Sequence, residues 1–333
     1  MKNDRDDLAC ELRKVAAQWH KSWHAFTKKG LTWVESASSR RMVLQHLAKL
    51  DLDTYFPWTK SREPASQSSV YKATVTYEGY CITLEPTLTS IATLVLLTQG
   101  RWFEKEIEFC RQLLQPGMVV IDVGANVGVY TFLAARCVGT TGRVYAIEPT
   151  PECVACLKST VVDNRLDSCV VPIDAAVGSQ LGQVFLVFKG ASVFNRIVTD
   201  RAFAGRGRVK AVGQLTLDHL WESENKPRVD LIKIDVEGAE LQVLQGSEQL
   251  LRKLEPIVMF ENRHTEKISG AEPVEFLATL GYKFYTYERY RARLKQVDPI
   301  ARRLNVLNLI AVPVTRQKSL PFNLCGVSEP GSL

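Results

Sequence analysis

Five carboxylate side chains each follow a short apolar run in this 333-residue chain, and the runs have the length and composition of buried strands. The acids are Asp122, Glu148, Asp174, Asp235 and Glu261. Bare carboxylates are costly beside a buried sheet, so their repetition at strand ends favours binding or catalysis over core formation. Open α/β sheets bind ligands beyond the carboxyl ends of their strands. The pattern therefore predicts a ligand site along that edge.

A glycine-rich turn follows the first of these acids. Gly124, Asn126 and Gly128 occupy alternate positions, and the pattern predicts a helix over 129–136. Gly adopts positive φ freely and Asn does so tolerably, so backbone N–H groups and a helix N-terminus can face a polar ligand. Glu148 lies 20 residues after Gly128, where a βαβ unit places a carboxylate over ribose hydroxyls. These residues alone leave open a nicotinamide dehydrogenase, an S-adenosylmethionine enzyme and a nucleotide-free α/β domain.

The order of segments from residue 100 to about 263 resembles the FkbM-type methyltransferases, a class I group that uses S-adenosylmethionine. Asn126 replaces the middle glycine of the general class I pattern and agrees with this subgroup. The KIDVEGAE string at 233–240 is far more specific than the glycine turn and disfavours a dehydrogenase. The resemblance is carried by 114–128 (LQPGMVVIDVGANVG), 142–151 (GRVYAIEPTP), 175–178 (AAVG), 216–218 (TLD), 229–240 (VDLIKIDVEGAE) and 260–262 (FEN).

The resemblance implies S-adenosylmethionine as the cofactor and gives roles to the residues around the turn. Asp122 is expected to receive the cationic amino end of the cofactor, directly or through the turn, and Glu148 to hold the ribose. Asp174 and Ala175 are expected to lie where the adenine amino group is recognised. Glu104 matches a family position near the cofactor.

Asp235, Glu237, Glu261 and His264 are then expected to face the methyl acceptor, with Asp235 as the favoured base. An alcohol is a poor nucleophile until a neighbouring base begins to remove its proton, so methylation of oxygen needs a carboxylate or imidazole within hydrogen-bond reach. The chain lacks the Asp/Asn-Pro-Pro-aromatic motif that many amino-group methyltransferases carry after the fourth strand. Its absence favours transfer to oxygen.

Two alternatives concern the acids after the fourth strand. Glu237 and Glu240 fit the first turn of a helix over 238–254, where acidic side chains are favourable. Catechol-type methyltransferases hold magnesium with acids after their fourth and fifth strands, and Asp235 with Glu261 and Asn262 occupies similar positions. That match is positional only. We therefore assign no metal and leave magnesium as an alternative.

The elements that must position these residues form a doubly wound pattern. Strands are predicted at 118–121, 143–147, 169–173, 230–234 and 256–260, with helices between them, as a parallel sheet requires. Late strands at 282–287 and 305–312 complete a mostly parallel, seven-stranded, Rossmann-like methyltransferase sheet of the α/β class with an antiparallel edge strand. Two extra strands, at 184–188 and 209–215, flank a loop over 189–208 that we expect to shape the acceptor pocket.

The chain divides into three parts. Residues 1–69 form a helical N-terminal extension, with helices predicted at 8–29 and 39–50 and a Pro/Ser-rich linker from 56. The methyltransferase domain spans 70–315, opening with a β-hairpin over 70–84, and its catalytic core begins at about residue 100. Residues 316–333 are expected to be a loose tail.

Composition favours a cytoplasmic protein. No apolar run has the length of a membrane span, and the charged N-terminus lacks the apolar core of a secretory signal. The eight cysteines form no disulfide framework. The close pair Cys153 and Cys156 falls in a predicted helix, where core packing is the favoured interpretation.

Most of the net charge of +6 lies in residues 283–303, where tyrosines interleave with lysines and arginines. We favour a solvated edge over a nucleic-acid surface, because the rest of the chain is nearly neutral, and an anionic or phosphorylated substrate is the intermediate option. The expected function is an S-adenosylmethionine-dependent O-methyltransferase acting on a small hydroxylated metabolite such as a sugar, a glycolipid or a polyketide-type product. The alternative is an RNA- or protein-directed methyltransferase or binding factor that uses the basic region.

Overall fold

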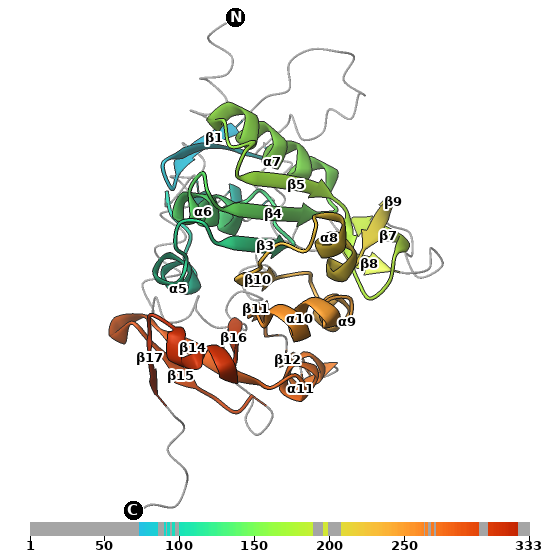
Figure 1. Ribbon diagram of the computed structural model, residues 1–333. Helices are drawn as coiled ribbons and strands as arrows, with labels where there is room; N and C mark the ends of the chain where they lie inside the picture. The colour runs from blue at the N-terminus through green and yellow to red at the C-terminus, as the bar shows by residue number, and fades with distance from the viewer. Residues whose placement is uncertain are drawn as a thin grey trace, which may run out of the picture.

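The computed structural model describes most of the chain from Ala73 onward (Figure 1). The predicted N-terminal helices and linker, and most of the 189–208 loop, lie outside the described residues. No helix in the described part has the length and apolar character needed to cross a bilayer. The described residues are 73–85, 90, 92–93, 95–96, 100–188, 196–198, 208–262, 264–265, 268–269, 271–299 and 306–325.

The main sheet has nine strands in the order β17-β15-β14-β16-β11-β10-β3-β4-β5. The strands from β11 to β5 pair in parallel, as predicted. The five parallel strands are β3 (Val119–Val123), β4 (Arg143–Glu148), β5 (Val170–Asp174), β10 (Leu231–Ile234) and β11 (Ile257–Glu261). The other four are β14 (Tyr282–Glu288), β15 (Arg293–Gln296), β16 (Asn308–Pro313) and β17 (Asn323–Cys325).

The predicted antiparallel edge strand needs correction. β16 is antiparallel to both of its neighbours, β11 and β14, so it lies inside the sheet. β14 does not end the sheet either, because β15 pairs with its outer edge and β17 pairs with β15. Unpaired strand edges leave backbone groups without partners, and the added strands satisfy those of β14. The tail predicted to be loose is therefore ordered over 316–325, in η5 (Val314–Ser319) and β17.

Helices cover both faces of the sheet, and each face has its own hydrophobic core (Figure 1). Consecutive strand residues point to opposite faces, so Val120 packs in one core and Ile121 in the other. One face carries α5 (Glu106–Leu113), α6 (Val129–Val138) and α7 (Pro151–Asn164). The other carries α8 (Leu217–Ser223), α9 (Glu240–Gln245), α10 (Glu248–Leu254) and α11 (Ala271–Thr279).

The single helix predicted over 238–254 is two helices, α9 and α10, separated at Gly246. A Cβ at Gly246 would lie 2.0 Å from the carbonyl oxygen of Gly178, so the chain passes against another backbone at this point. The Gly246 carbonyl also accepts a hydrogen bond from the N–H of Asp218 at 2.9 Å. The break therefore results from tertiary contacts.

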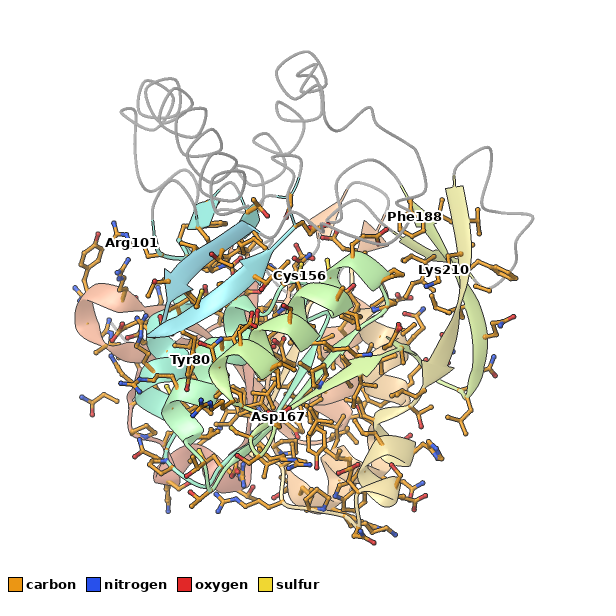
Figure 2. All side chains as sticks on the ribbon, turned by 90° about the horizontal axis from the view of Figure 1, so that it is seen from above. Tyr80, Arg101, Cys156, Asp167, Phe188 and Lys210 are labelled. Carbon is orange, nitrogen blue, oxygen red and sulfur yellow. The ribbon has the colours of Figure 1, made fainter. Side chains whose placement is uncertain are left out.

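The described residues also form three smaller sheets, one of which is the short antiparallel pair β12 (His264–Thr265) and β13 (Ile268–Ser269). β6 (Ala176–Val177), β7 (Gly182–Phe188), β8 (Arg196–Val198) and β9 (Arg208–Leu215) form a sheet in the order β6-β9-β7-β8. β1 (Ala73–Tyr77) and β2 (Tyr80–Leu84) form the predicted hairpin. Figure 2 shows this hairpin lying along α7, where Asn164 exchanges two 2.9 Å hydrogen bonds with the backbone of Cys81.

Candidate active site

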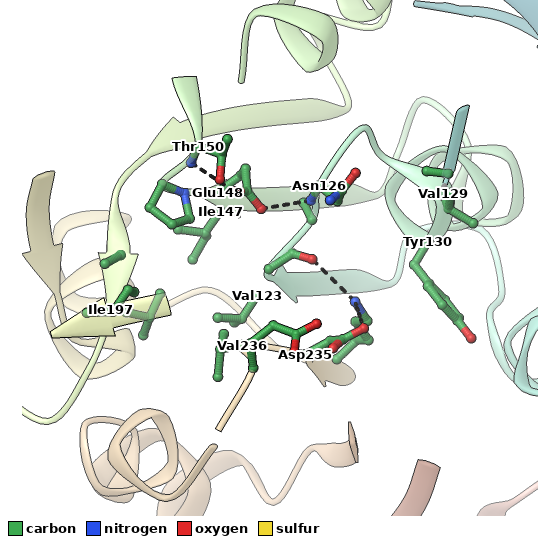
Figure 3. Close-up of a pocket in the computed structure, with 18 of the residues that line it drawn as sticks. Val123, Asn126, Val129, Tyr130, Ile147, Glu148, Thr150, Ile197, Asp235 and Val236 are labelled. Atoms are coloured by element: carbon green, nitrogen blue, oxygen red, sulfur yellow. Dashed lines mark hydrogen bonds and ion pairs between the residues drawn. The ribbon is translucent and has the colours of Figure 1, made fainter. Parts of the chain in front are cut away.

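A pocket opens at the carboxyl ends of β3, β4, β5 and β10, where the sequence predicts a ligand site (Figure 3). Its floor is the turn after β3, and the loops after β4 and β10 form two of its walls. Leu186 and Ile197 of the small four-stranded sheet close one end. Trp102, Phe103 and Glu104 contribute to the opposite part of the lining. Segments far apart in the sequence thus converge at the carboxyl ends of the parallel strands.

The turn after β3 depends on residues that accept positive φ. Gly124 has a φ of +76°, Asn126 +52° and Gly128 +97°. A Cβ at Gly124 would lie 1.9 Å from the carbonyl oxygen of Asp235, so glycine lets the β3 and β10 loops touch. Gly128 precedes α6 and does not line the pocket; a Cβ there would press on Phe132.

Glu148 is tied to this turn by its carboxylate. One oxygen accepts a hydrogen bond from the backbone N–H of Asn126 at 2.9 Å, and the other accepts one from Thr150 at 2.8 Å (Figure 3). Burial raises the pKa of Glu148, and these hydrogen bonds oppose the rise because they favour the ionised form. The two hydrogen bonds fix the orientation of the carboxylate, which lines the pocket.

Asp122 lies beneath the turn and does not line the pocket. Its side chain is buried, accepts a 2.6 Å hydrogen bond from the Thr131 hydroxyl and has the Lys233 ammonium 3.6 Å away. Of its two expected routes to the cofactor, the one through the turn agrees with this placement. Asp174 is exposed at the end of β5 and also lies outside the lining, whereas its neighbour Ala175 is part of it.

Glu104 lines the pocket as part of a polar group. It accepts a hydrogen bond of 2.6 Å from the Tyr130 hydroxyl and one of 3.3 Å from the Asn308 amide. Burial, and next the Glu104 charge, hold the pKa of Tyr130 well above its usual value, so the phenol remains a donor. Glu106, close by, is almost fully buried, and burial raises its pKa to about 7.

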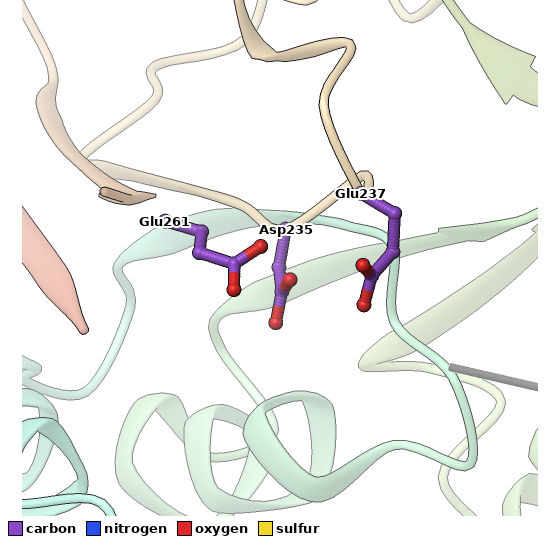
Figure 4. A group of neighbouring side chains, drawn as sticks. All are labelled: Asp235, Glu237 and Glu261. Carbon is purple, nitrogen blue, oxygen red and sulfur yellow. The ribbon is translucent and has the colours of Figure 1, made fainter. Parts of the chain in front are cut away.

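Three acids gather on the β10 side of the pocket. Carboxylate oxygens of Asp235, Glu237 and Glu261 lie within 4.8 Å of one another (Figure 4). Asp235 and Glu237 line the pocket, whereas Glu261 is buried behind them at the end of β11. Oxygen atoms so grouped could hold a hard cation, or they could serve as bases. His264 lies in β12 (His264–Thr265), and its side chain falls outside the description.

Lys233 was not among the predicted site residues, and Glu237 was expected either to face the acceptor or to start a helix. Glu237 is not in the first turn of a helix: it has a φ of +59°, α9 begins at Glu240, and Glu240 accepts a hydrogen bond from Gly238. Lys233 lines the pocket from the middle of β10. The sequence signal that could have identified Lys233 is a charged residue inside the apolar run 231–234.

The doubly wound sheet, the glycine turn and the acid at the end of β4 fit a Rossmann-like methyltransferase. The family model for the methyltransferase FkbM domain matches residues 122–288, and the chain belongs to this family. S-adenosylmethionine dependence is typical of the family, and methyltransferase activity follows from membership.

Relatives with curated descriptions are also methyltransferases. The chain is 28% identical over 192 residues to hexuronic acid methyltransferase AglP of Haloferax volcanii, covering 56% of this chain and 71% of the relative. It is 28% identical over 200 residues to methyltransferase sdnD of Sordaria araneosa, covering 52% and 75%. The crystal structure of methyltransferase FkbM from Methylobacillus flagellatus matches with 12% identity and a TM-score of 0.40, covering 66% of this chain and 53% of that one.

Proposed function

We propose that this protein is an S-adenosylmethionine-dependent O-methyltransferase whose acceptor is a small hydroxylated metabolite, such as a sugar, a glycolipid or a polyketide-type product. The observation that carries the proposal is the convergence in one pocket of two separate acid groups. Glu148, held by the turn, lies on one side, and Asp235 with Glu237 lies on the other. The first suits the nucleoside of the cofactor and the second suits an acceptor hydroxyl.

The lining fits the cofactor chemically. Glu148 presents a fixed carboxylate for the ribose hydroxyls, and Val123, Ile147 and Val236 supply apolar surface for a purine. Glu104 offers a carboxylate for an ammonium group. The described lining carries four acids against one lysine, which favours a positively charged ligand (Glu104, Glu148, Asp235, Glu237; Lys233).

The residues on the β10 side would act on the acceptor. When bound, S-adenosylmethionine supplies a methyl group on a sulfonium, which is already a good leaving group. Asp235 accepts the hydroxyl proton as the new oxygen–carbon bond forms, which makes the alcohol a competent nucleophile. Glu237 and Glu261 lie near enough to orient the acceptor or to share its proton. Alignment within the pocket supplies much of the remaining acceleration.

The same acids bear on the class of acceptor. Carboxylates accept hydrogen bonds from neighbouring hydroxyls, and they repel an anionic group brought into contact with them. A neutral polyol therefore fits better than an acceptor that presents a carboxylate to this wall. AglP is named a hexuronic acid methyltransferase, so it supports a sugar as the acceptor class, but its own acceptor carries a carboxyl group and does not support the preference for a neutral one.

The basic region gives little support to the RNA-directed alternative. Tyr282, Tyr285 and Tyr287 are buried in the sheet, and only Tyr290 among the interleaved tyrosines is exposed. A surface that recognises single-stranded RNA stacks the bases on exposed aromatic side chains. In addition, Arg293 forms a 2.7 Å ion pair with Glu288.

Binding calorimetry tests the cofactor. S-adenosylmethionine and its demethylated product should bind at micromolar strength, about −8 kcal/mol, whereas NADH should not bind. Binding of NADH with no binding of either sulfur compound would overturn the proposal. Weak, salt-sensitive RNA binding is expected, and submicromolar, sequence-selective binding at physiological salt would favour the alternative.

A further inference from the structure

Lys233 occupies an unusual place for a lysine. It lies in the centre of β10, between the buried residues Ile232 and Ile234, and only 6% of its surface is exposed. In the sheet it is paired in register with Asp122 of β3. Burying an ammonium group is costly unless it is paired, so its surroundings must compensate the charge.

The Lys233 ammonium group contacts both the turn at the floor of the pocket and the wall formed after β10. Its Nζ lies 3.4 Å from Asp235 Oδ2, 3.6 Å from Asp122 Oδ1 and 3.4 Å from the carbonyl oxygen of Gly124. It also stands over the ring of Tyr130, 5.1 Å from the centroid. One cation thus joins the turn after β3 to the acid after β10, and the dashed line that ends at Asp235 in Figure 3 marks its ion pair with that acid.

The two carboxylates differ in what they need from Lys233. Asp122 is buried, with 1% of its side chain exposed, so its pairing compensates a charge that water cannot reach. Asp235 lines the pocket with 18% of its side chain exposed, so water can solvate it in part. The contact with Asp235 therefore matters more for where the carboxylate points than for neutralising it.

The backbone reinforces this link. Gly124 packs so closely on Asp235 that a Cβ would lie 1.9 Å from the Asp235 carbonyl oxygen. Lys233 adds a side-chain connection between the same two loops, from the Gly124 carbonyl to the Asp235 carboxylate. A shift of Asp235 would therefore disturb the turn that forms the floor of the pocket.

We infer that Lys233 is a positioning residue for methyl transfer, whose ammonium group holds the Asp235 carboxylate beside the Gly124 turn, where cofactor and acceptor meet. The inference rests on the proposed function, because it assigns Lys233 an effect through the proposed base.

Lys233→Met tests the inference, with Lys226→Met as the matched control. Lys226 is half exposed and stands over Trp221, so it makes a similar ring contact on the surface. The probe is S-adenosylmethionine tritiated on its methyl group, mixed with a small-molecule extract from cells that lack the gene. With saturating cofactor, Lys233→Met should lower the initial rate of tritium transfer about 10- to 100-fold, a part of the general-base contribution. Calorimetry should show cofactor affinity within about threefold of wild type, and Lys226→Met should match wild type in both measurements.

A double-mutant cycle separates positioning from a merely structural role. If Lys233 acts through Asp235, then adding Lys233→Met to Asp235→Asn should lower the rate by less than about threefold further. Lys233→Arg guards against loss of folding, because it keeps the charge. It should transfer faster than the methionine variant yet slower than wild type, since a guanidinium cannot occupy the same point.

Three results would overturn the inference. They are a wild-type rate in Lys233→Met, full multiplication of the two losses in the double variant, and equal rates for the arginine and methionine variants. A wild-type protein that neither binds S-adenosylmethionine nor transfers tritium would instead refute the proposed function.

Discussion

Replacing Glu148 with glutamine should weaken cofactor binding. The wild-type carboxylate accepts hydrogen bonds from Asn126 and Thr150 and lines the pocket, so its remaining lone pairs are aimed at the ligand. Glutamine keeps the shape but loses the charge, and it turns an NH2 group toward one backbone N–H. The change converts charge-assisted hydrogen bonds to a ribose into neutral ones or removes them.

The expected loss is about 1.5–3 kcal/mol of binding free energy, the scale for hydrogen bonds to charged groups, or roughly 10- to 150-fold in Kd. Both S-adenosylmethionine and its demethylated product should weaken equally, because they share the ribose. Leaving one buried N–H without an acceptor should also lower the free energy of unfolding by about 1–3 kcal/mol.

Titration calorimetry with both ligands measures the affinities, and urea unfolding measures the stability. Glu152→Gln is the control, because Glu152 is exposed one turn further along, at the start of α7. It should bind as wild type does. Unchanged affinity in Glu148→Gln, or a loss confined to one of the two ligands, would refute the ribose assignment.

The remaining predictions concern the acceptor side, the buried acid behind the pocket and the turn. Asp235→Asn and Glu261→Gln should each lower turnover about a hundredfold to ten-thousandfold while still binding the cofactor. Wild-type turnover in both variants would refute the proposed base. Activity that is abolished by a chelator and restored by magnesium would make these acids metal ligands. Burial raises the pKa of Glu106 from 4.5 to about 7, so stability from its proton is fully present below pH 4.5 and lost as pH rises through 7. Urea unfolding should be measured for wild type and for Glu106→Gln, which cannot ionise. Between pH 4.5 and about pH 8, the difference in free energy of unfolding between the two proteins should change by about 3 kcal/mol in favour of the variant. A difference that does not depend on pH would contradict the burial argument. Gly124→Ala should lose cofactor binding and destabilise the fold by about 1–3 kcal/mol or more, because φ is +76° and the added Cβ would clash with the Asp235 carbonyl oxygen. Cofactor binding equal to wild type in calorimetry would contradict the close packing of the two loops.

The parallel part of the sheet was predictable because its signals are local. Buried parallel strands are continuous apolar runs, and each predicted run became a strand within one or two residues of its expected bounds. The glycine turn was equally predictable, since positive φ favours Gly and Asn, the residue types found at positions 124, 126 and 128.

The wrong or missing predictions concern features that depend on contacts between segments far apart in the sequence. The helix break at Gly246 depends on Gly178, far away in the sequence, and β15 and β17 form because β14 offers an unpaired edge. A helix start stayed open for Glu237 because acids favour first turns, whereas its backbone is left-handed and the residue lines the pocket. Lys233 was overlooked because its partners come from β3 and from the loop after its own strand.

The most direct test of the account is the transfer of a labelled methyl group. The wild-type protein is incubated with S-adenosylmethionine deuterated on its methyl group and with a small-molecule extract from cells that lack the gene, and the products are examined by mass spectrometry. The account predicts a neutral hydroxylated compound that gains one deuterated methyl group and keeps it after alkaline hydrolysis, as an ether does. A label that appears on nitrogen, a label released by alkali as from a methyl ester, or no labelled product would contradict it.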